Sequence, residues 1–234
     1  MTWDNFSAAL LDLDGVITPT ADVHMKAWAH LFTAYLAERG VRPYTDSDYF
    51  DHLDGKPRYA GVQTLLASRG IELPFGDPSD APTAETVCGL GNRKDGVFNE
   101  MLAEGIEAYP GSLRLLDFLD ANNIAKAVVS SSKNARGVLT AAGIVDRFPV
   151  IVDGLVAAES GIPGKPAPDM FHFAADQLGV PYPACVVVED ALSGVRAGAA
   201  GGFGLVVGVD RGTGADRLRE AGAEVIVAEL DELI

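Results

Sequence analysis

The chain has 234 residues, of which 48% are hydrophobic and 22% charged, a composition that excludes an intrinsically disordered protein and allows one core domain with a smaller inserted domain. The formal net charge of −15 repels the phosphates of nucleic acids and of anionic membranes, which excludes both as partners. Because the N-terminus lacks the basic flank of a signal peptide and no apolar stretch is long enough to span a bilayer, we expect a cytoplasmic protein.

The first half of the chain contains one short strand followed by helical segments. Apolar residues over 8–13 predict a buried strand that ends at the turn Asp-Leu-Asp-Gly. Apolar residues at helical spacing predict a helix over 22–39. Residues 41–105 contain several prolines, which predict short helices and a loop over 74–82.

From residue 109 onward, helices alternate with apolar strands. The expected helices are 112–121, 134–142, 169–178, 192–199 and 215–221, and the expected strands are 125–129, 150–152, 185–188, 203–207 and 224–227. Such alternation builds a parallel sheet with helices on both faces. We therefore predict an α/β fold with a Rossmann-like, doubly wound parallel sheet core (1–19 and 106–234) and an inserted α-helical cap domain (20–105) after the first strand.

Carboxylates follow two of the predicted strands. Asp12 and Asp14 end the first strand, and Glu189 with Asp190 follows the apolar run 185–188. Each pair taken alone fits a solvated turn equally well. In a parallel sheet, however, the ligand site lies at the carboxyl ends of the strands, so all four residues are expected at one edge. Such a cluster must take up protons or bind a cation, and donors that are all oxygen atoms indicate Mg²⁺.

A lysine and a run of hydroxyl side chains accompany these carboxylates. Lys165 lies in the glycine- and proline-rich segment 164–169, just before the expected helix 169–178. There it could reach the carboxylates or remain solvated. Ser130 ends the second strand, and the polar run continues to Asn134 at a helix start, a favourable place for an anion. The same hydroxyl groups could instead cap that helix, and the two interpretations are compatible.

In this order and on these elements, the residues resemble a known set of motifs. Asp12-x-Asp14, Ser130, Lys165 and Glu189-Asp190 are similar to the four motifs of the haloacid dehalogenase-like superfamily. Within it, the chain most resembles the β-phosphoglucomutase-like subfamily. The segments that carry this closer similarity are Asp12–Thr18 with Thr20, His24 and Trp28, then Ser130–Asn134, Gly164–Asp169 and Glu189–Gly194.

The resemblance implies a mechanism for phosphoryl transfer. Asp12 is expected to attack phosphorus and form an aspartyl phosphate, and Asp14 to act as general acid and then as general base. Mg²⁺ is expected to be held by Asp12, the backbone carbonyl of Asp14, and Asp190, with Glu189 close by.

The resemblance also implies how the substrate is bound. Ser130 and Lys165 are expected to hold the phosphoryl oxygens, and Arg58 and Lys94 in the cap to bind a second phosphate. The alternatives without a role in binding are that Arg58 and Lys94 are exposed surface cations and that His24 is a packing residue. The full set of expected substrate-binding residues is His24, Trp28, Gly55, Arg58, Lys94, Ser131, Ser132, Lys133 and Asn134.

The expected reaction is Mg²⁺-dependent conversion of β-glucose 1-phosphate to glucose 6-phosphate by a monomer or weak homodimer. The first alternative is a phosphatase acting on a small sugar or polyol phosphate, and a non-enzymatic alternative is a sugar-phosphate sensor. A dehalogenase is disfavoured because it needs neither Asp14 nor Glu189-Asp190. A phosphonatase would need a Schiff-base lysine in the cap, for which Lys26, Lys56 and Lys94 are available.

Two features depart from the subfamily's pattern. Pro19 stands where an acidic residue is more common, and segment 71–92, with its sequence Gly89-Leu90-Gly91, is expected to be an insertion near the substrate. Both bear on which sugar is used.

Overall fold

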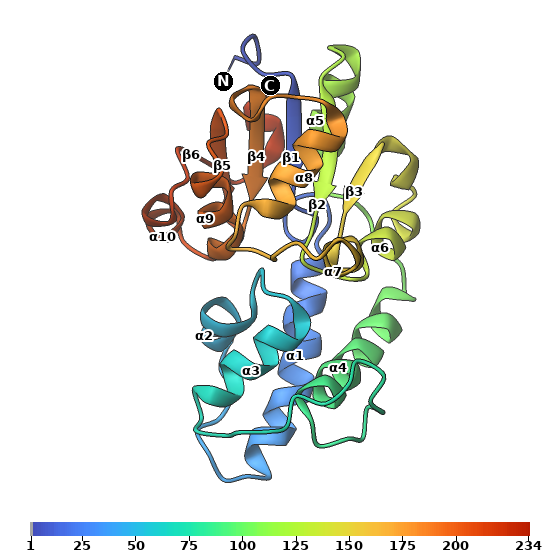
Figure 1. The fold of residues 1–234 in the computed structure, drawn as a ribbon, viewed down its shortest axis with the longest axis vertical. Helices are drawn as coiled ribbons and strands as arrows, with labels where there is room; N and C mark the ends of the chain where they lie inside the picture. The colour runs from blue at the N-terminus through green and yellow to red at the C-terminus, as the bar shows by residue number, and fades with distance from the viewer. Residues whose placement is uncertain (1) are drawn as a thin grey trace. The chain divides into compact units, whose positions relative to one another are not determined.

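The computed structural model describes residues 2–234, and these divide into two compact units (Figure 1). The first unit contains the residues up to Thr20 together with Ile106–Ile234. The second unit contains Ala21–Gly105. The chain therefore leaves the first unit once, after its first strand, and returns to it once.

A six-stranded parallel sheet with the order β3-β2-β1-β4-β5-β6 forms the centre of the first unit (Figure 1). Leu11 at the end of β1 pairs with Val128 of β2 on one side and with Val188 of β4 on the other. The β1 and β4 strands are buried throughout, which explains why they are continuous apolar runs and not alternating ones. The strands are β1 (Ala8–Leu11), β2 (Ala125–Val129), β3 (Val150–Val152), β4 (Cys185–Glu189), β5 (Leu205–Val209) and β6 (Val225–Val227).

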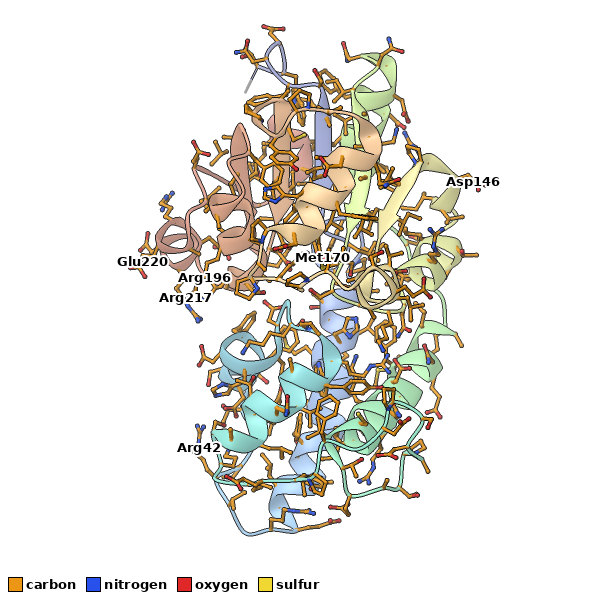
Figure 2. All side chains as sticks on the ribbon, in the orientation of Figure 1. Arg42, Asp146, Met170, Arg196, Arg217 and Glu220 are labelled. Carbon is orange, nitrogen blue, oxygen red and sulfur yellow. The ribbon has the colours of Figure 1, made fainter. Side chains whose placement is uncertain are left out.

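Helices flank this sheet. They are α5 (Pro110–Ala121), α6 (Ala135–Ala141), α7 (Gly154–Ser160), α8 (Asp169–Leu178), α9 (Leu192–Ala200) and α10 (Ala215–Ala221), with short 3₁₀ turns η2 (Val145–Arg147), η3 (Tyr182–Ala184) and η4 (Leu230–Leu233). The α8 helix packs on β1, β2 and β3 and buries Met170 and Phe171. Figure 2 shows Met170 on this helix, whereas Asp146 and Glu220 lie at the outer margins of the unit.

The second unit is helical. Its elements are α1 (Thr20–Ala37), α2 (Asp46–Asp48), the π-helical segment η1 (Tyr49–Leu53), α3 (Arg58–Ala67) and α4 (Val87–Leu102). Its core contains the fully buried Phe32, Leu65 and Leu90, together with Trp28. The stacked rings of Trp28 and Phe32, with centroids 5.6 Å apart, pack α1 into this core.

The predicted α/β fold class is confirmed. Strands 125–129 and 150–152 and helices 169–178 and 215–221 have the expected bounds. The α7 helix was not expected; Asp153 caps it by accepting hydrogen bonds from the amides of Leu155 (3.0 Å) and Val156 (2.9 Å).

Gly89-Leu90-Gly91, which we expected within an insertion near the substrate, form the first turns of α4. The placement of segment 71–92 near the substrate stays a prediction. The amide of Gly89 donates to the Thr86 hydroxyl at 2.9 Å, which caps the helix. A Cβ atom at Gly91 would lie 2.8 Å from the Tyr59 ring, so glycine here permits close packing of α3 and α4.

Cys88 and Cys185 are both buried, and Cys185 begins β4 as the small buried side chain that its apolar run predicts. Burial raises the pKa of the Cys185 thiol to about 11. Within residues 2–234, no helix combines the length and the apolar character needed to cross a membrane.

Candidate active site

Three of the predicted carboxylates meet at the carboxyl ends of β1 and β4. The amide of Asp12 donates to the Val188 carbonyl at 2.9 Å. This bond continues the β1–β4 ladder by one residue and holds the Asp12 backbone at the end of β1. Asp12, Glu189 and Asp190 are all buried, and one carboxylate oxygen from each lies within 4.8 Å of the others. The grouping predicted from strand ends is therefore present.

Lys165 joins two of these carboxylates. Its Nζ atom donates to Asp12 Oδ1 at 2.5 Å, to Glu189 Oε1 at 2.5 Å and to the Val129 carbonyl at 2.7 Å. All three ammonium hydrogens are therefore used. The lysine side chain is 1% exposed, so the alternative of a solvated loop lysine is wrong.

Opposing effects act on the ionisable groups of this cluster. Burial alone would lower the pKa of Lys165, but the carboxylates of Asp12 and Glu189 outweigh it and raise that pKa. Burial raises the pKa of the Glu189 carboxyl group, and the charge of Asp12 adds to this effect, while Lys165 opposes it. Lys165 contacts two of the three carboxyl groups, and the charge of the third, Asp190, acts on Arg211. Because the donors are oxygen atoms only, the residues fit a hard divalent cation such as Mg²⁺.

Asp14 has a different set of partners. The Thr20 hydroxyl donates to Asp14 Oδ1 and is itself 2.8 Å from the Thr18 hydroxyl. The Ser130 hydroxyl lies 3.5 Å from Asp14 Oδ2, which is too long for a strong O–H···O bond. Asp12 is thus held by an ammonium group and Asp14 by hydroxyl groups, an arrangement that lets two nearby carboxyl groups take different roles.

The serine run between β2 and α6 folds back on its own backbone. The Ser130 hydroxyl accepts from the amide of Ser132 at 3.1 Å, and the Ser132 hydroxyl accepts from the amide of Asn134 at 3.2 Å. Ser131 and Lys133 are partly exposed in the same turn. These bonds close the turn before α6, whose first residue is not capped by a side-chain hydrogen bond, so the helix-capping alternative is not seen. The predicted anion-binding role of the run stays a prediction.

The sequence reasoning assigned no role to three residues at this edge. A Cβ atom at Gly194 would overlap the Glu189 carboxylate, so this position needs glycine. The Thr213 hydroxyl donates to the Asp190 carbonyl at 3.2 Å, and Arg211 donates to the Gly15 carbonyl at 2.9 Å. The rule that found Asp12 would have found Arg211, because Arg211 also follows a strand, β5.

Comparison with known families agrees with this geometry. A model described as haloacid dehalogenase-like hydrolase matches residues 6–202, which is most of the chain. The chain belongs to this family. The structure and the family model therefore support the same assignment as the four motifs.

Relatives place this haloacid dehalogenase-like protein in the β-phosphoglucomutase-like subfamily. A β-phosphoglucomutase of Mycobacterium tuberculosis is 49% identical over 97% of this chain and 91% of its own length. One from Bacillus subtilis is 34% identical over 97% of this chain and 91% of its own length. The crystal structure of a β-phosphoglucomutase from Clostridium difficile is 27% identical, with a TM-score of 0.78, and the match covers 98% of this chain and 93% of that one.

In the second unit of this haloacid dehalogenase-like protein, the buried Lys94 pairs with the partly buried His24. The Lys94 ammonium contacts His24 Nδ1 and lies 4.5 Å from the Phe98 ring centroid and 5.1 Å from that of Trp28. Lys94 is 2% exposed, so the alternative of a surface cation is wrong. Burial, with the charges of Lys94 and Arg58, holds the pKa of His24 well below its ordinary value.

Arg58 begins α3 and is bound to an acidic neighbour. Its Nη2 atom lies 2.5 Å from Asp95 Oδ1, and its Nη1 atom lies 3.5 Å from Asn92 Oδ1. The Arg58 side chain is 15% exposed, so it is not a freely solvated cation either. Gly55 adopts a φ of +63° in the turn before α3, a conformation that favours glycine.

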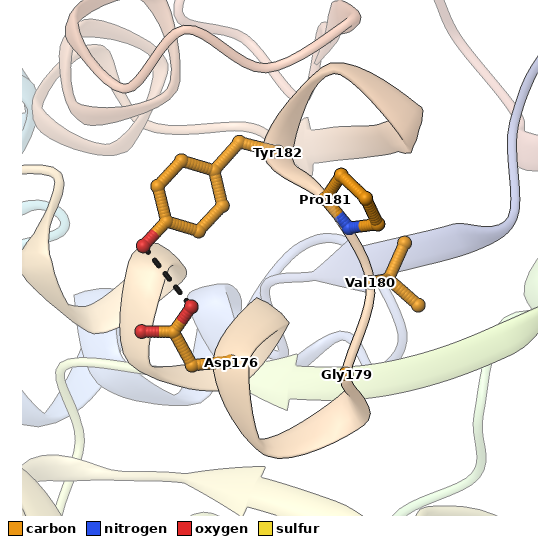
Figure 3. A pocket seen from close by; sticks show the side chains of 5 residues that line it. All are labelled: Asp176, Gly179, Val180, Pro181 and Tyr182. Carbon is orange, nitrogen blue, oxygen red and sulfur yellow. Dashed lines mark hydrogen bonds between the residues drawn. The ribbon is translucent and has the colours of Figure 1, made fainter.

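A surface hollow lies elsewhere on the first unit (Figure 3). It is lined by the end of α8 and the segment leading into β4, from Asp176 to Tyr182, whose hydroxyl donates to Asp176 at 3.0 Å. Because this segment precedes β4, the hollow lies at the amino ends of the strands. None of the motif residues lines it, so it is not a candidate active site.

Proposed function

We propose that this chain is a phosphosugar mutase that converts β-glucose 1-phosphate to glucose 6-phosphate through an aspartyl phosphate at Asp12. The observation that carries the proposal is the separate support of two carboxyl groups. Asp12 is bound by the Lys165 ammonium, and Asp14 is bound by the Thr20 hydroxyl. The identity with β-phosphoglucomutases supports the choice of sugar.

In the first half-reaction, an Asp12 carboxylate oxygen attacks the phosphorus of a sugar bisphosphate. A bond forms between Asp12 and phosphorus, the bond from phosphorus to the sugar oxygen breaks, and Asp14 donates its proton to that leaving oxygen. Lys165 and Ser130 are the proposed ligands of the phosphoryl oxygens. This role is supported by the 2.5 Å contact of Lys165 with Asp12.

The second half-reaction reverses these roles. The 6-hydroxyl group of β-glucose 1-phosphate loses its proton to Asp14 and attacks the phosphorus of the aspartyl phosphate. The bond to Asp12 breaks and returns the carboxylate, and a bisphosphate is formed. The bisphosphate then reorients within the site, or dissociates and binds again. The next transfer to Asp12 leaves glucose 6-phosphate.

Asp12, Asp190 and the backbone carbonyl of Asp14 are the proposed ligands of Mg²⁺, with Glu189 close by. When bound, the ion supplies charge that offsets the repulsion between a carboxylate nucleophile and a phosphate. The three buried carboxyl groups, each with an oxygen within 4.8 Å of the others, support this proposal because such oxygen donors suit a hard divalent cation.

The second unit is proposed to act as the cap that selects the substrate. Arg58 is the proposed ligand of the second phosphate, and Lys94 and His24 are proposed to bind sugar or phosphate oxygens. Gly55 and Trp28 are proposed to shape the site. Trp28 is 5% exposed and packs in the core of this unit. The run Ser131, Ser132, Lys133 and Asn134 is proposed to contact the transferring phosphate.

The alternative is a phosphatase, which shares every step up to the aspartyl phosphate. Water would then replace the sugar hydroxyl as the acceptor. A sensor without activity is disfavoured because Asp12, Asp14 and Lys165 are all present.

The test follows two products at once. The protein is incubated with Mg²⁺ and β-glucose 1-phosphate, with and without a trace of glucose 1,6-bisphosphate, and glucose 6-phosphate and free phosphate are both measured. Glucose 6-phosphate that depends on the bisphosphate would support the mutase. Free phosphate without isomerisation would replace it with the phosphatase, and Asp12→Asn gives the background of both assays.

A further inference from the structure

Arg211 lies just after β5 and binds the backbone next to Asp14. Its Nε atom donates to the Gly15 carbonyl at 2.9 Å. We propose that Arg211 is a positioning residue, whose guanidinium group holds the Asp14–Gly15 turn so that the Asp14 carboxyl group meets the oxygen with which it exchanges a proton. This inference rests on the proposed role of Asp14.

The turn after Asp14 is anchored at three successive carbonyl groups, each by a different part of the first unit. Arg211 donates to the carbonyl of Gly15, the Ser112 hydroxyl donates to that of Val16 at 2.7 Å, and the Tyr109 amide donates to that of Ile17 at 2.9 Å. Of these three anchors, Arg211 bonds to the carbonyl nearest to Asp14 in the chain. It also supplies the charged donor of the three, and charge-assisted bonds are the stronger kind.

Arg211 is itself held in one orientation. Its Nη1 and Nη2 atoms lie 2.8 Å and 3.3 Å from the two carboxylate oxygens of Glu229, and its guanidinium carbon lies 4.0 Å from the centroid of the Tyr109 ring. A planar guanidinium group bound to both oxygens of a carboxylate and stacked on a ring cannot turn freely. The contacts with Glu229 and Tyr109 therefore keep the Nε–H group directed at the Gly15 carbonyl.

The consequence for catalysis depends on the leaving group. Transfer of a proton requires the donor and the acceptor to meet closely, and a displacement of about 1 Å can reduce a rate by about 100-fold. A sugar oxygen needs a proton as it leaves, whereas p-nitrophenolate leaves as a stable anion without one. Loss of Arg211 should therefore slow phosphorylation of Asp12 by a sugar phosphate and spare phosphorylation by p-nitrophenyl phosphate.

The test measures the single-turnover rate of Asp12 phosphorylation in the presence of Mg²⁺, with glucose 1,6-bisphosphate and with p-nitrophenyl phosphate. Arg211→Gln is expected to slow the first reaction about 10- to 100-fold and the second by less than about threefold. Arg211→Lys keeps the charge without the planar fork and should fall between wild type and Arg211→Gln. Glu229→Gln leaves Arg211 in place but loosens it, and should show a smaller defect of the same kind.

A matched control is Arg114 of α5, which also pairs with a carboxylate of the C-terminal segment. Arg114 donates from Nε and Nη2 to Asp231 at 2.9 and 2.5 Å, and it does not bind the turn after Asp14. Arg114→Gln should leave both rates unchanged. Equal slowing of both reactions by Arg211→Gln, or an unchanged rate with the bisphosphate, would overturn the proposal.

Asp14→Asn separates this inference from the proposed function. It should show the same dependence on leaving group in a stronger form. If Asp14→Asn slows both reactions equally, the proton-transfer role of Asp14 is wrong and the Arg211 proposal falls with it. If Asp14→Asn shows the dependence and both Arg211→Gln and Glu229→Gln lack it, only the role of Arg211 is wrong.

Discussion

The Nζ atom of Lys165 lies 2.5 Å from Asp12 Oδ1, and both side chains are buried at the carboxyl ends of the strands. The same ammonium group contacts Glu189, so one buried cation pairs with two buried carboxylates. Removal of one partner from a buried ion pair leaves the other charges uncompensated, which is costly even where the intact pair adds little stability.

Lys165→Gln should therefore reduce the free energy of unfolding by about 3–5 kcal/mol in metal-free buffer, measured by urea denaturation. Lys126→Gln is the matched control, because Lys126 of β2 pairs with a half-exposed carboxylate, that of Asp120 on α5. The control should lose about 1 kcal/mol or less. Similar losses in the two variants would show that Lys165 does not form the buried ion pairs with Asp12 and Glu189 described above.

The pKa of His24 is lowered, and this gives the protein a sensitivity to acid. An unfolded histidine titrates near pH 6.5, so as pH falls the unfolded chain takes up this proton before the folded chain does. The contribution to stability is complete above pH 6.5 and declines below it, by up to about 1.4 kcal/mol for each pH unit. His24→Gln should remove this part of the difference between unfolding free energies at pH 7.5 and pH 5.0. His30→Gln, at an exposed position on the same helix, should keep the pH dependence of the wild type. An unchanged pH dependence in His24→Gln would count against the lowered pKa of His24.

Asp95 competes with substrate for Arg58 if Arg58 binds the second phosphate. Asp95→Asn removes a counter-ion that lies 2.5 Å from the guanidinium group. We expect the KM for β-glucose 1-phosphate to fall about two- to fivefold, the equivalent of an ion pair worth up to about 1 kcal/mol, with kcat unchanged. Arg58→Ala should raise KM. A higher KM in Asp95→Asn would mean that Asp95 orients Arg58 for binding and does not compete for it.

Mg²⁺ should stabilise the folded protein by binding the carboxylate cluster. A ligand at about 100 times its Kd adds about 2.7 kcal/mol to the free energy of unfolding, so the melting temperature should rise with added MgCl₂. Asp190→Asn should lose most of that rise, and NaCl at equal ionic strength should not produce it in the wild type. A similar rise in Asp190→Asn would place the ion elsewhere.

The parts of the fold that local chemistry determines were predictable. The apolar run 125–129 and the helix 169–178, which ends at Gly179 in a left-handed conformation, match the structure because burial and capping act locally. The carboxylates at the ends of β1 and β4 were predictable for a related reason, since parallel strands bring their carboxyl ends to one edge.

Other features depend on contacts that the sequence does not display. Gly89 and Gly91 lower helix propensity by about 1 kcal/mol each, yet both lie in α4. A Cβ atom would overlap the Ala84 carbonyl oxygen at Gly89 and would lie 2.8 Å from the Tyr59 ring at Gly91, so close neighbours require glycine there. The bond from Arg211 to Gly15 joins residues 196 positions apart, and no local pattern indicates it. The burial of Lys94 among aromatic rings is likewise a product of packing.

Formation of an aspartyl phosphate at Asp12 is the central claim, and it can be observed directly. The protein is mixed with glucose 1,6-bisphosphate and Mg²⁺, quenched in acid within one turnover, digested and analysed by mass spectrometry. We predict one added phosphoryl group on the peptide that contains Asp12, absent in Asp12→Asn and retained in Asp190→Asn only at a much lower rate. A phosphoryl group on another residue, or turnover to product by Asp12→Asn at the wild-type rate, would contradict the account.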